Sequence, residues 1–334
     1  MIRPIQYLRG IAAMMVVWHH SLGQVDGTMN FIRLPPFGQY GVDLFFMISG
    51  FIMLVTTWDK PVTPLEFIGN RVRRIVPLYW LTTLLMLGVA IIAPGLFKTL
   101  KFDVASILKS LFFIPYDSLS FPGSIWPLLV PGWTLNYEMF FYALFAGTLL
   151  VERNWRVPIM VAVLSALVVA GYALHPSGAA LQVYTNHMLL EFGAGMILGR
   201  IWVMRKHARR GGGHAVLMAL GDASYSIYLT HIFTLGALRI IWVRVVPDAS
   251  MASSIALMAV SLAVSALVGY GVFRWVEKPL TDRLRGLVVR RDAARVLKRF
   301  FNWLSGPMHT HCIVCEAKFS KPQKSFRCHE CDAW

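Results

Sequence analysis

Apolar residues form long blocks along the chain, and shorter polar segments separate the blocks. Each block runs for roughly 16–25 residues, which is enough for an α-helix to cross the ~30 Å hydrocarbon core of a bilayer. A membrane β-barrel would need apolar and polar residues to alternate with a period of two, and the sequence lacks that pattern. We therefore expect an all-α, polytopic transmembrane helical bundle of about eight spans, at residues 5–22, 41–58, 75–94, 133–151, 156–174, 186–204, 219–242 and 251–275.

Shorter segments with a different character connect or follow these spans. The longest connection contains residues 102–114, which have apolar residues at helical spacing but are too few to cross a membrane. We expect them to form a helix at the membrane interface. Residues 281–300 have the pattern of a basic amphipathic helix suited to the inner leaflet. The predicted organisation is a transmembrane domain at 1–280, a basic amphipathic segment at 281–308 and a Cys-rich tail at 309–334.

Composition and charge add an orientation to this pattern. Hydrophobic residues make up 56% of the chain and charged residues 15%, whereas about a quarter of the residues in soluble domains are charged. If the N-terminus is cytoplasmic, 26 of the 32 Lys and Arg residues fall in cytoplasmic segments, which are 1–9, 59–74, 152–156, 200–214 and 274–334. The positive-inside rule therefore predicts that both termini are cytoplasmic. The net charge of +15 is scattered among these segments, which favours anionic lipid as a partner and argues against nucleic acid.

Two ionisable residues in the first predicted span, Arg9 and His20, are candidates for a functional site. Such residues cost about 2.5–3.5 kcal/mol each on insertion scales when they lie at the centre of a membrane helix. They are eleven residues apart, close to three helical turns, so they share one helix face about 16 Å apart along the axis. The alternative is that Arg9 extends to the inner headgroups and that His20 only packs against other helices.

Further ionisable residues occur at the ends of other spans. Asp43, in the stretch GQYGVDLFFMISGF, is expected near the external end of the second span, level with His20. Glu138, in WTLNYEMFFY, is expected in the outer third of the fourth span. Arg71, Arg73 and Arg74 are expected at the cytoplasmic mouth of the third span. Four more residues either line a cavity or bond to one another across helices: His187, Glu191, Tyr225 and His231.

Taken together, these motifs resemble acyltransferase family 3 of bacterial membrane proteins, especially its exopolysaccharide-production branch. The N-terminal stretch IQYLRGIAAMMVVWHH carries most of the likeness, which extends in order through SYSIYLTH and EKP to about residue 280. The resemblance implies an enzyme of the bacterial inner membrane that takes an acyl group from cytoplasmic acyl-CoA, with acetyl-CoA expected, and transfers it to a glycan. Family members usually have about ten spans, and here a short basic loop at 205–218 stands in place of two.

The family's motifs give roles to several residues. Its Arg-x10-His motif corresponds to Arg9 and His20, and its Arg-x-x-Arg motif to Arg71 and Arg74, where arginines would bind the phosphates of acyl-CoA. An imidazole near neutral pH can act as a general base or can itself take the acyl group, and the sequence leaves both open. Either Glu138 or Asp43 would orient that imidazole, and Arg9 would bind phosphate or polarise the thioester carbonyl.

The tail contains all four cysteines of the chain, in two Cys-x2-Cys pairs separated by twelve residues. This spacing is typical of a structural zinc knuckle with reduced thiolates, and two disulfides are the alternative. Four thiolates leave no open position on the metal, so we expect a structural zinc rather than a catalytic one. The predicted ligands are Cys312, Cys315, Cys328 and Cys331.

The sequence therefore predicts a membrane O-acyltransferase that acylates a sugar hydroxyl of an exported polysaccharide or of its lipid-linked precursor. Its expected partners are membrane lipid, acyl-CoA, the glycan acceptor and the polysaccharide synthesis machinery. A transporter or flippase for a lipid-linked glycan is the alternative, because it would use the same intramembrane charges as a polar path. A third hypothesis is a membrane-anchored adaptor whose zinc unit binds a partner protein.

Overall fold

The computed structural model describes residues 2–25, 37–96, 99–205, 214–246, 250–289, 309–311 and 318–323. The chain divides into two units, Met1–Leu280 and Thr281–Trp334. In the first unit, the elements of the described residues are all helices. In the second, the described residues include two short antiparallel strands, β1 (His309–His311) and β2 (Lys318–Gln323).

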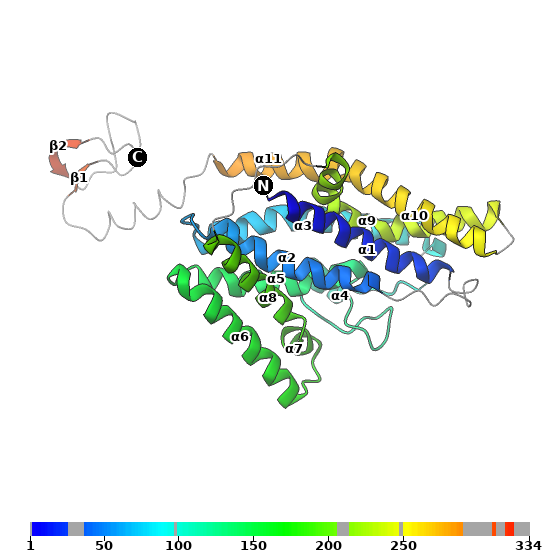
Figure 1. Cartoon of the computed structure of the whole chain (residues 1–334), viewed down its shortest axis with the longest axis horizontal. Helices are drawn as coiled ribbons and strands as arrows, with labels where there is room; N and C mark the ends of the chain where they lie inside the picture. The colour runs from blue at the N-terminus through cyan, green and yellow to red at the C-terminus, as the bar shows by residue number, and fades with distance from the viewer. Residues whose placement is uncertain are drawn as a thin grey trace. The chain divides into compact units, whose positions relative to one another are not determined.

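A helix occupies each of the eight positions that the hydrophobic pattern predicts (Figure 1). These helices are α1 (Arg3–Val25), α2 (Tyr40–Thr57), α3 (Pro64–Ile92), α5 (Trp133–Thr148), α6 (Arg153–Leu174), α8 (Leu189–Met204), α9 (Ala215–Val245) and α10 (Met251–Val272). The shorter ones are α4 (Val104–Leu111), which confirms the helix expected within 102–114, and α7 (Ala179–Tyr184). A π-helical turn, η4 (Phe273–Glu277), leads into α11 (Lys278–Val289), and the rest of the amphipathic helix expected at 281–300 lies outside the described residues.

Six of the described helical segments are long and apolar enough to cross a membrane. They are Phe37–Thr57, Pro64–Ile92, Arg153–Leu174, Ala179–Met204, Ala215–Val245 and Met251–Leu284. The other two predicted spans form helices that fall short of this measure for different reasons. Helix α5 has 16 residues, and α1 contains Arg9, His19 and His20 among its apolar residues, which lower its hydropathy.

Two helices depart from their predicted boundaries or continuity. Helix α3 begins at Pro64, well before the predicted start at 75, because the Thr63 hydroxyl accepts a hydrogen bond of 3.2 Å from the Glu66 amide and Pro64 suits the first helical position. The arginines at 71–74 therefore lie within the helix instead of before it. Helix α9 continues unbroken through Gly221 and Asp222, which interrupt the apolar pattern of the seventh predicted span.

Glycines allow α2 and α8 to pack with their backbones in close contact. A Cβ atom added at Gly50 of α2 would lie against the carbonyl oxygen of Phe192, and one added at Gly195 of α8 would lie against that of Met47. Gly193 of α8 takes no part in this contact. An added Cβ there would meet a side-chain carbon of Leu164 at an ordinary 3.6 Å. Gly193 faces away from the α2–α8 contact.

Aromatic side chains fill the centre of the first unit. Phe46 of α2, Phe141 of α5 and Phe192 of α8 are at most 1% exposed. The ring of Phe192 stacks on Phe141 with centroids 4.4 Å apart and on Phe46 with centroids 4.6 Å apart. These phenylalanines therefore pack three helices together, and the helices around them hold the cavities described below.

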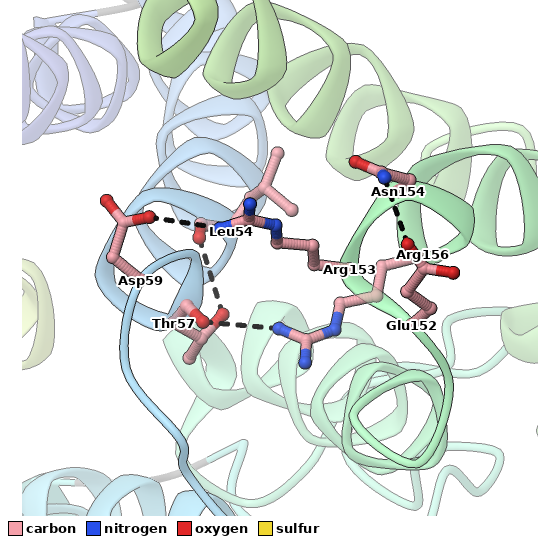
Figure 2. Close-up of polar contacts among 7 residues, drawn as sticks. All are labelled: Leu54, Thr57, Asp59, Glu152, Arg153, Asn154 and Arg156. Carbon is pink, nitrogen blue, oxygen red and sulfur yellow. Dashed lines mark hydrogen bonds and ion pairs between the residues drawn. The ribbon is translucent and has the colours of Figure 1, made fainter.

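Two of the segments that the charge count assigns to the cytoplasmic side meet between α2 and α6 (Figure 2). The Arg153 guanidinium lies 3.4 Å from the Asp59 carboxylate. Arg156 donates a hydrogen bond of 3.2 Å to the backbone carbonyl of Thr57 at the end of α2. Residues from 59–74 and from 152–156 therefore lie at the same end of the bundle, as a common orientation requires.

Two further contacts extend this shared end to the other basic segments of the first unit. The Arg200 side chain donates a hydrogen bond of 3.3 Å to the backbone carbonyl of Asn154. The backbone amide of His214 donates one of 2.6 Å to the Tyr7 hydroxyl. Direct contacts thus join the segments 1–9, 152–156 and 200–214. The positive-inside rule assigns these same segments to one side of the membrane.

Candidate functional site

Side chains of α1, α2, α3, α5 and α9 line a cavity of about 90 Å³ that we call the arginine cavity. Its charged lining residues are Arg9, Arg71, Arg74 and Glu138. With three guanidinium groups and one carboxylate, their formal charges sum to a positive value. The cavity is suited to a small group that carries negative charge or a polarised carbonyl.

The arginines of α3 are separated by the helical period. Arg71 and Arg74 are three residues apart, so they share a face of the helix, and both line the cavity. The Arg71 guanidinium lies over the rings of Phe67 and Tyr142, 5.3 Å and 5.9 Å from their centroids. Arg73 instead donates a hydrogen bond of 3.1 Å to Asn70 on an exposed part of α3. Two of the three predicted arginines therefore contribute to the cavity.

Arg9 is held in position by a chain of hydrogen bonds that the sequence analysis did not identify. Its Nη1 donates a bond of 2.9 Å to Gln6 Oε1, and Gln6 Nε2 donates one of 2.7 Å to Asp222 Oδ1 of α9. Asp222 is an acidic residue within a predicted span, which was a detectable signal. These hydrogen bonds fix the guanidinium between α1 and α9, with Arg74, Glu277 and Glu138 as charged neighbours.

Glu138 lies with the arginines and not with His20. Its Oε1 accepts a hydrogen bond of 3.0 Å from the Tyr142 hydroxyl, which lies 3.3 Å from the Ser49 hydroxyl. The sequence predicts how deep Glu138 lies in the fourth span, but not which side of α5 it faces. In the structure, Glu138 faces the arginine cavity, where its carboxyl group lies among three arginines.

A second cavity, of about 500 Å³, contains His20 and is called here the histidine cavity. The ring of His20 stacks on that of His231 from α9, with centroids 5.0 Å apart and planes at 30°. Asp43 lines the same cavity, which agrees with the prediction that it lies level with His20. Other polar and aromatic lining residues are His19, Gln39, Trp126, Trp133, His187 and Glu191.

Val42 and Tyr228 line both cavities and therefore form part of the wall between them. The Tyr228 hydroxyl lies 2.9 Å from the hydroxyl of Thr134 and donates a hydrogen bond of 2.9 Å to the carbonyl of Pro131. The ring also contacts Phe45, with centroids 5.8 Å apart. These contacts hold the tyrosine in place where the two cavities adjoin.

Tyr225, the remaining candidate of α9, lines the arginine cavity and donates a hydrogen bond of 2.7 Å to the Ile75 carbonyl of α3. Within the described residues, no group of His, Cys, Asp and Glu is arranged to hold a metal ion. The zinc ligands that the sequence predicts lie outside those residues, so the zinc knuckle stays a prediction. They are Cys312, Cys315, Cys328 and Cys331.

Comparison with known proteins gives this arrangement a family. An acyltransferase domain of the acyltransferase 3 family matches residues 3–212. The chain is 38% identical over 299 residues to the exopolysaccharide production protein ExoZ of Rhizobium meliloti (strain 1021), covering 74% of this chain and 91% of that protein. It is 27% identical over 168 residues to the peptidoglycan O-acetyltransferase OatA of Listeria monocytogenes serovar 1/2a (strain ATCC BAA-679 / EGD-e), covering 45% of this chain and 24% of that protein. No solved structure matches the chain. The chain therefore belongs to the acyltransferase 3 family and is an O-acyltransferase.

Proposed function

We propose that this membrane protein moves an acyl group, acetyl in the simplest case, from cytoplasmic acyl-CoA to a sugar hydroxyl. The acceptor is an exported polysaccharide or its lipid-linked precursor at the bacterial inner membrane. The observation that carries the proposal is the arrangement of the two cavities along α1. Arg9 lines the arginine cavity near one end of the helix, and His20 lines the histidine cavity near the other end.

The donor side of the reaction fits the arginine cavity. Acyl-CoA carries several phosphate charges, and Arg71 and Arg74 present two forks that can bind phosphate oxygens bidentately. A cavity of about 90 Å³ holds only a few water-sized groups, which suits the acyl thioester end and excludes the nucleotide. In this arrangement the phosphates bind at the mouth, and Arg9 polarises the thioester carbonyl deeper in.

The acceptor side fits the histidine cavity, whose volume of about 500 Å³ lies in the range typical of small-molecule sites. The reaction needs a base for the acceptor hydroxyl or a nucleophile that carries the acyl group, and His20 supplies either. The acceptor oxygen bonds to the acyl carbon, the carbon–sulfur bond breaks, and the hydroxyl proton ends on the departing thiol. Asp43 shares the cavity and is the carboxylate available to orient the imidazole.

The relatives support a glycan acceptor. One is named for exopolysaccharide production and the other for O-acetylation of peptidoglycan, which is also a glycan polymer. Trp126 and Trp133 share the lining of the histidine cavity with Asp43 and Glu191, and aromatic faces together with carboxylates suit the apolar faces and hydroxyl groups of a sugar. The polysaccharide synthesis machinery is the expected source of the acceptor.

A His20→Ala variant tests the function. In a strain that lacks its own copy of the gene, we expect the wild-type chain to raise the acetate released from exported polysaccharide by mild alkali. The His20→Ala variant should lose this gain at normal abundance and with normal export. His214→Ala is a matched control, because His214 lies outside both cavities. Lost export with normal acylation would instead support the flippase, and a wild-type chain that adds no acyl groups would refute the proposal.

For the tail, we propose that Cys312, Cys315, Cys328 and Cys331 bind one structural zinc ion. Four thiolates at this spacing form a closed tetrahedral site, so the zinc would stabilise the tail and take no part in acyl transfer. Metal analysis of the purified full chain should give about one zinc per chain. A Cys312→Ser, Cys315→Ser double variant should bind none and keep its acyltransferase activity. Cysteines that are oxidised in cells would contradict the zinc proposal.

A further inference from the structure

His231 is a buried histidine in the histidine cavity, and the proposed function gives it no role. Its side chain is 0% exposed, it lines the cavity, and its ring stacks on that of His20 with centroids 5.0 Å apart. The hydrogen bonds of the ring show what it presents there.

The contact with Tyr228 fixes the tautomer of His231. Its Nδ1 lies 2.7 Å from the backbone carbonyl oxygen of Tyr228. A carbonyl oxygen only accepts hydrogen bonds, so Nδ1 carries the hydrogen. In the neutral ring the lone pair is then on Nε2, which is buried and has no hydrogen-bond partner among the residues that the structure describes. The fold thus holds a basic nitrogen with a set tautomer and leaves its acceptor position open.

We propose that His231 is a second catalytic histidine, whose Nε2 accepts the proton of the acceptor hydroxyl. This inference rests on the proposed function and divides its chemistry between two rings. The acceptor oxygen gives its proton to Nε2 as it bonds to the acyl carbon. The bond from that carbon to its carrier breaks, and the proton passes from Nε2 to the departing atom. The carrier is the sulfur of CoA or, in a relay, a ring nitrogen of His20.

The geometry gives the two histidines different tasks. His20 lies on α1, which also carries Arg9 in the arginine cavity, and in this proposal His20 handles the acyl group. His231 is anchored through Nδ1 to the same turn of α9 that carries Tyr228 at the wall between the cavities. Its orientation is therefore set before the acceptor binds, as an efficient general base requires.

Two variants separate this role from a structural one. In His231→Asn the amide can still donate to the Tyr228 carbonyl, as Nδ1 does, but the nitrogen at the Nε2 position is lost. In His231→Gln an amide reaches the Nε2 position without basicity, and the donor at Nδ1 is lost. If His231 is only structural, the His231→Asn variant should keep its activity. If His231 is a general base, both variants should lose it.

The experiment measures the acetate content of exported polysaccharide in the strain that lacks its own gene. Titration of the purified full chain with acetyl-CoA serves as the test of folding and of donor binding. We expect both variants to lower acylation by about 100-fold or more, the usual contribution of a general base, while acetyl-CoA binds with unchanged affinity. If His231→Asn prevents the protein from accumulating, acylation near the wild-type level in His231→Gln would overturn the inference instead.

The outcomes are distinct. Acylation near the wild-type level in His231→Asn would overturn the inference and leave His231 as an anchor for Tyr228. Weakened acetyl-CoA binding in both variants would also overturn it, because the donor side would then be disturbed. A wild-type chain that adds no acetate relative to the deletion strain would be a failure of the proposed function and not of the histidine assignment.

Discussion

At the scale of single residues, the direction in which a side chain points decides what it can do. Residues 71–74 of the helix carry three arginines, and the helical period sends Arg71 and Arg74 into the arginine cavity while Arg73 pairs with Asn70 outside. The three have the same charge and nearly the same depth. Differences between their variants therefore report on direction rather than on charge.

We expect an Arg74→Gln variant to bind acetyl-CoA about tenfold more weakly or worse, since a hydrogen bond to a charged group contributes roughly 1.5–3 kcal/mol. The matched Arg73→Gln variant removes the same charge from the outer face and should bind within about twofold of wild type. Calorimetric titration of the purified chain with acetyl-CoA measures both. Equal losses in the two variants would show that general attraction, and not the cavity, holds the donor.

The sequence predicts part of this site for physical reasons. The eleven-residue spacing of Arg9 and His20 and the three-residue spacing of Arg71 and Arg74 follow from helix geometry, so their shared faces are readable from the chain. Glu138 is different, because its depth is readable but the rotation of α5 about its axis depends on the packing of other helices. The contact from Gln6 to Asp222 joins residues 216 positions apart, which no local pattern contains.

At the scale of helices, apolar block length predicts where helices occur, while their ends follow from capping. All eight blocks lie in helices. Helix α3 starts earlier than its block because Thr63 and Pro64, which lie outside the apolar block, begin the helix. Close packing is also decided by position on a face. Gly50 touches the backbone of α8, and Gly193, within α8 itself, does not touch that of α2.

A pair of alanine variants tests this packing. Gly50→Ala places a methyl group against the Phe192 carbonyl, so α2 and α8 must move apart, and overpacking of this kind typically costs 1–3 kcal/mol. We expect less folded protein and a lower melting temperature in detergent. Gly193→Ala adds the same methyl group where it meets Leu164 at 3.6 Å, and it should be tolerated. Equal destabilisation of the two variants would contradict the assigned contact.

At the scale of the whole molecule, the contacts between basic segments show which loops lie at the same end of the helices. The ion pair of Asp59 with Arg153 and the bond from Arg200 to Asn154 place three loops at one end of the helices. The charge bias predicts that this end faces the cytoplasm. Since the loops are tied together, the orientation of one determines the orientation of the others.

Cysteine labelling tests the orientation. Lys60→Cys is on the predicted cytoplasmic side and Lys101→Cys on the opposite side, and both positions are exposed. A membrane-impermeant maleimide added outside the inner membrane should label Lys101→Cys at once and Lys60→Cys only after the membrane is opened. The four natural cysteines are predicted to be cytoplasmic, so the wild-type chain serves as the blank. Immediate labelling of Lys60→Cys would show that the chain has the opposite orientation in the membrane.

The wall that contains Val42 and Tyr228 has a consequence for the energy supply of the cell. On the proposed orientation, one cavity faces the cytoplasm and the other faces outward, and the two share these side chains. A bacterium stores energy as a proton gradient across this same membrane, and a continuous file of water through the protein would discharge it. The bonds that hold the Tyr228 hydroxyl to Thr134 and Pro131 keep this ring in place where the two cavities adjoin. If the chain carries acyl groups across this membrane as proposed, the ring of Tyr228 also has to limit the passage of protons.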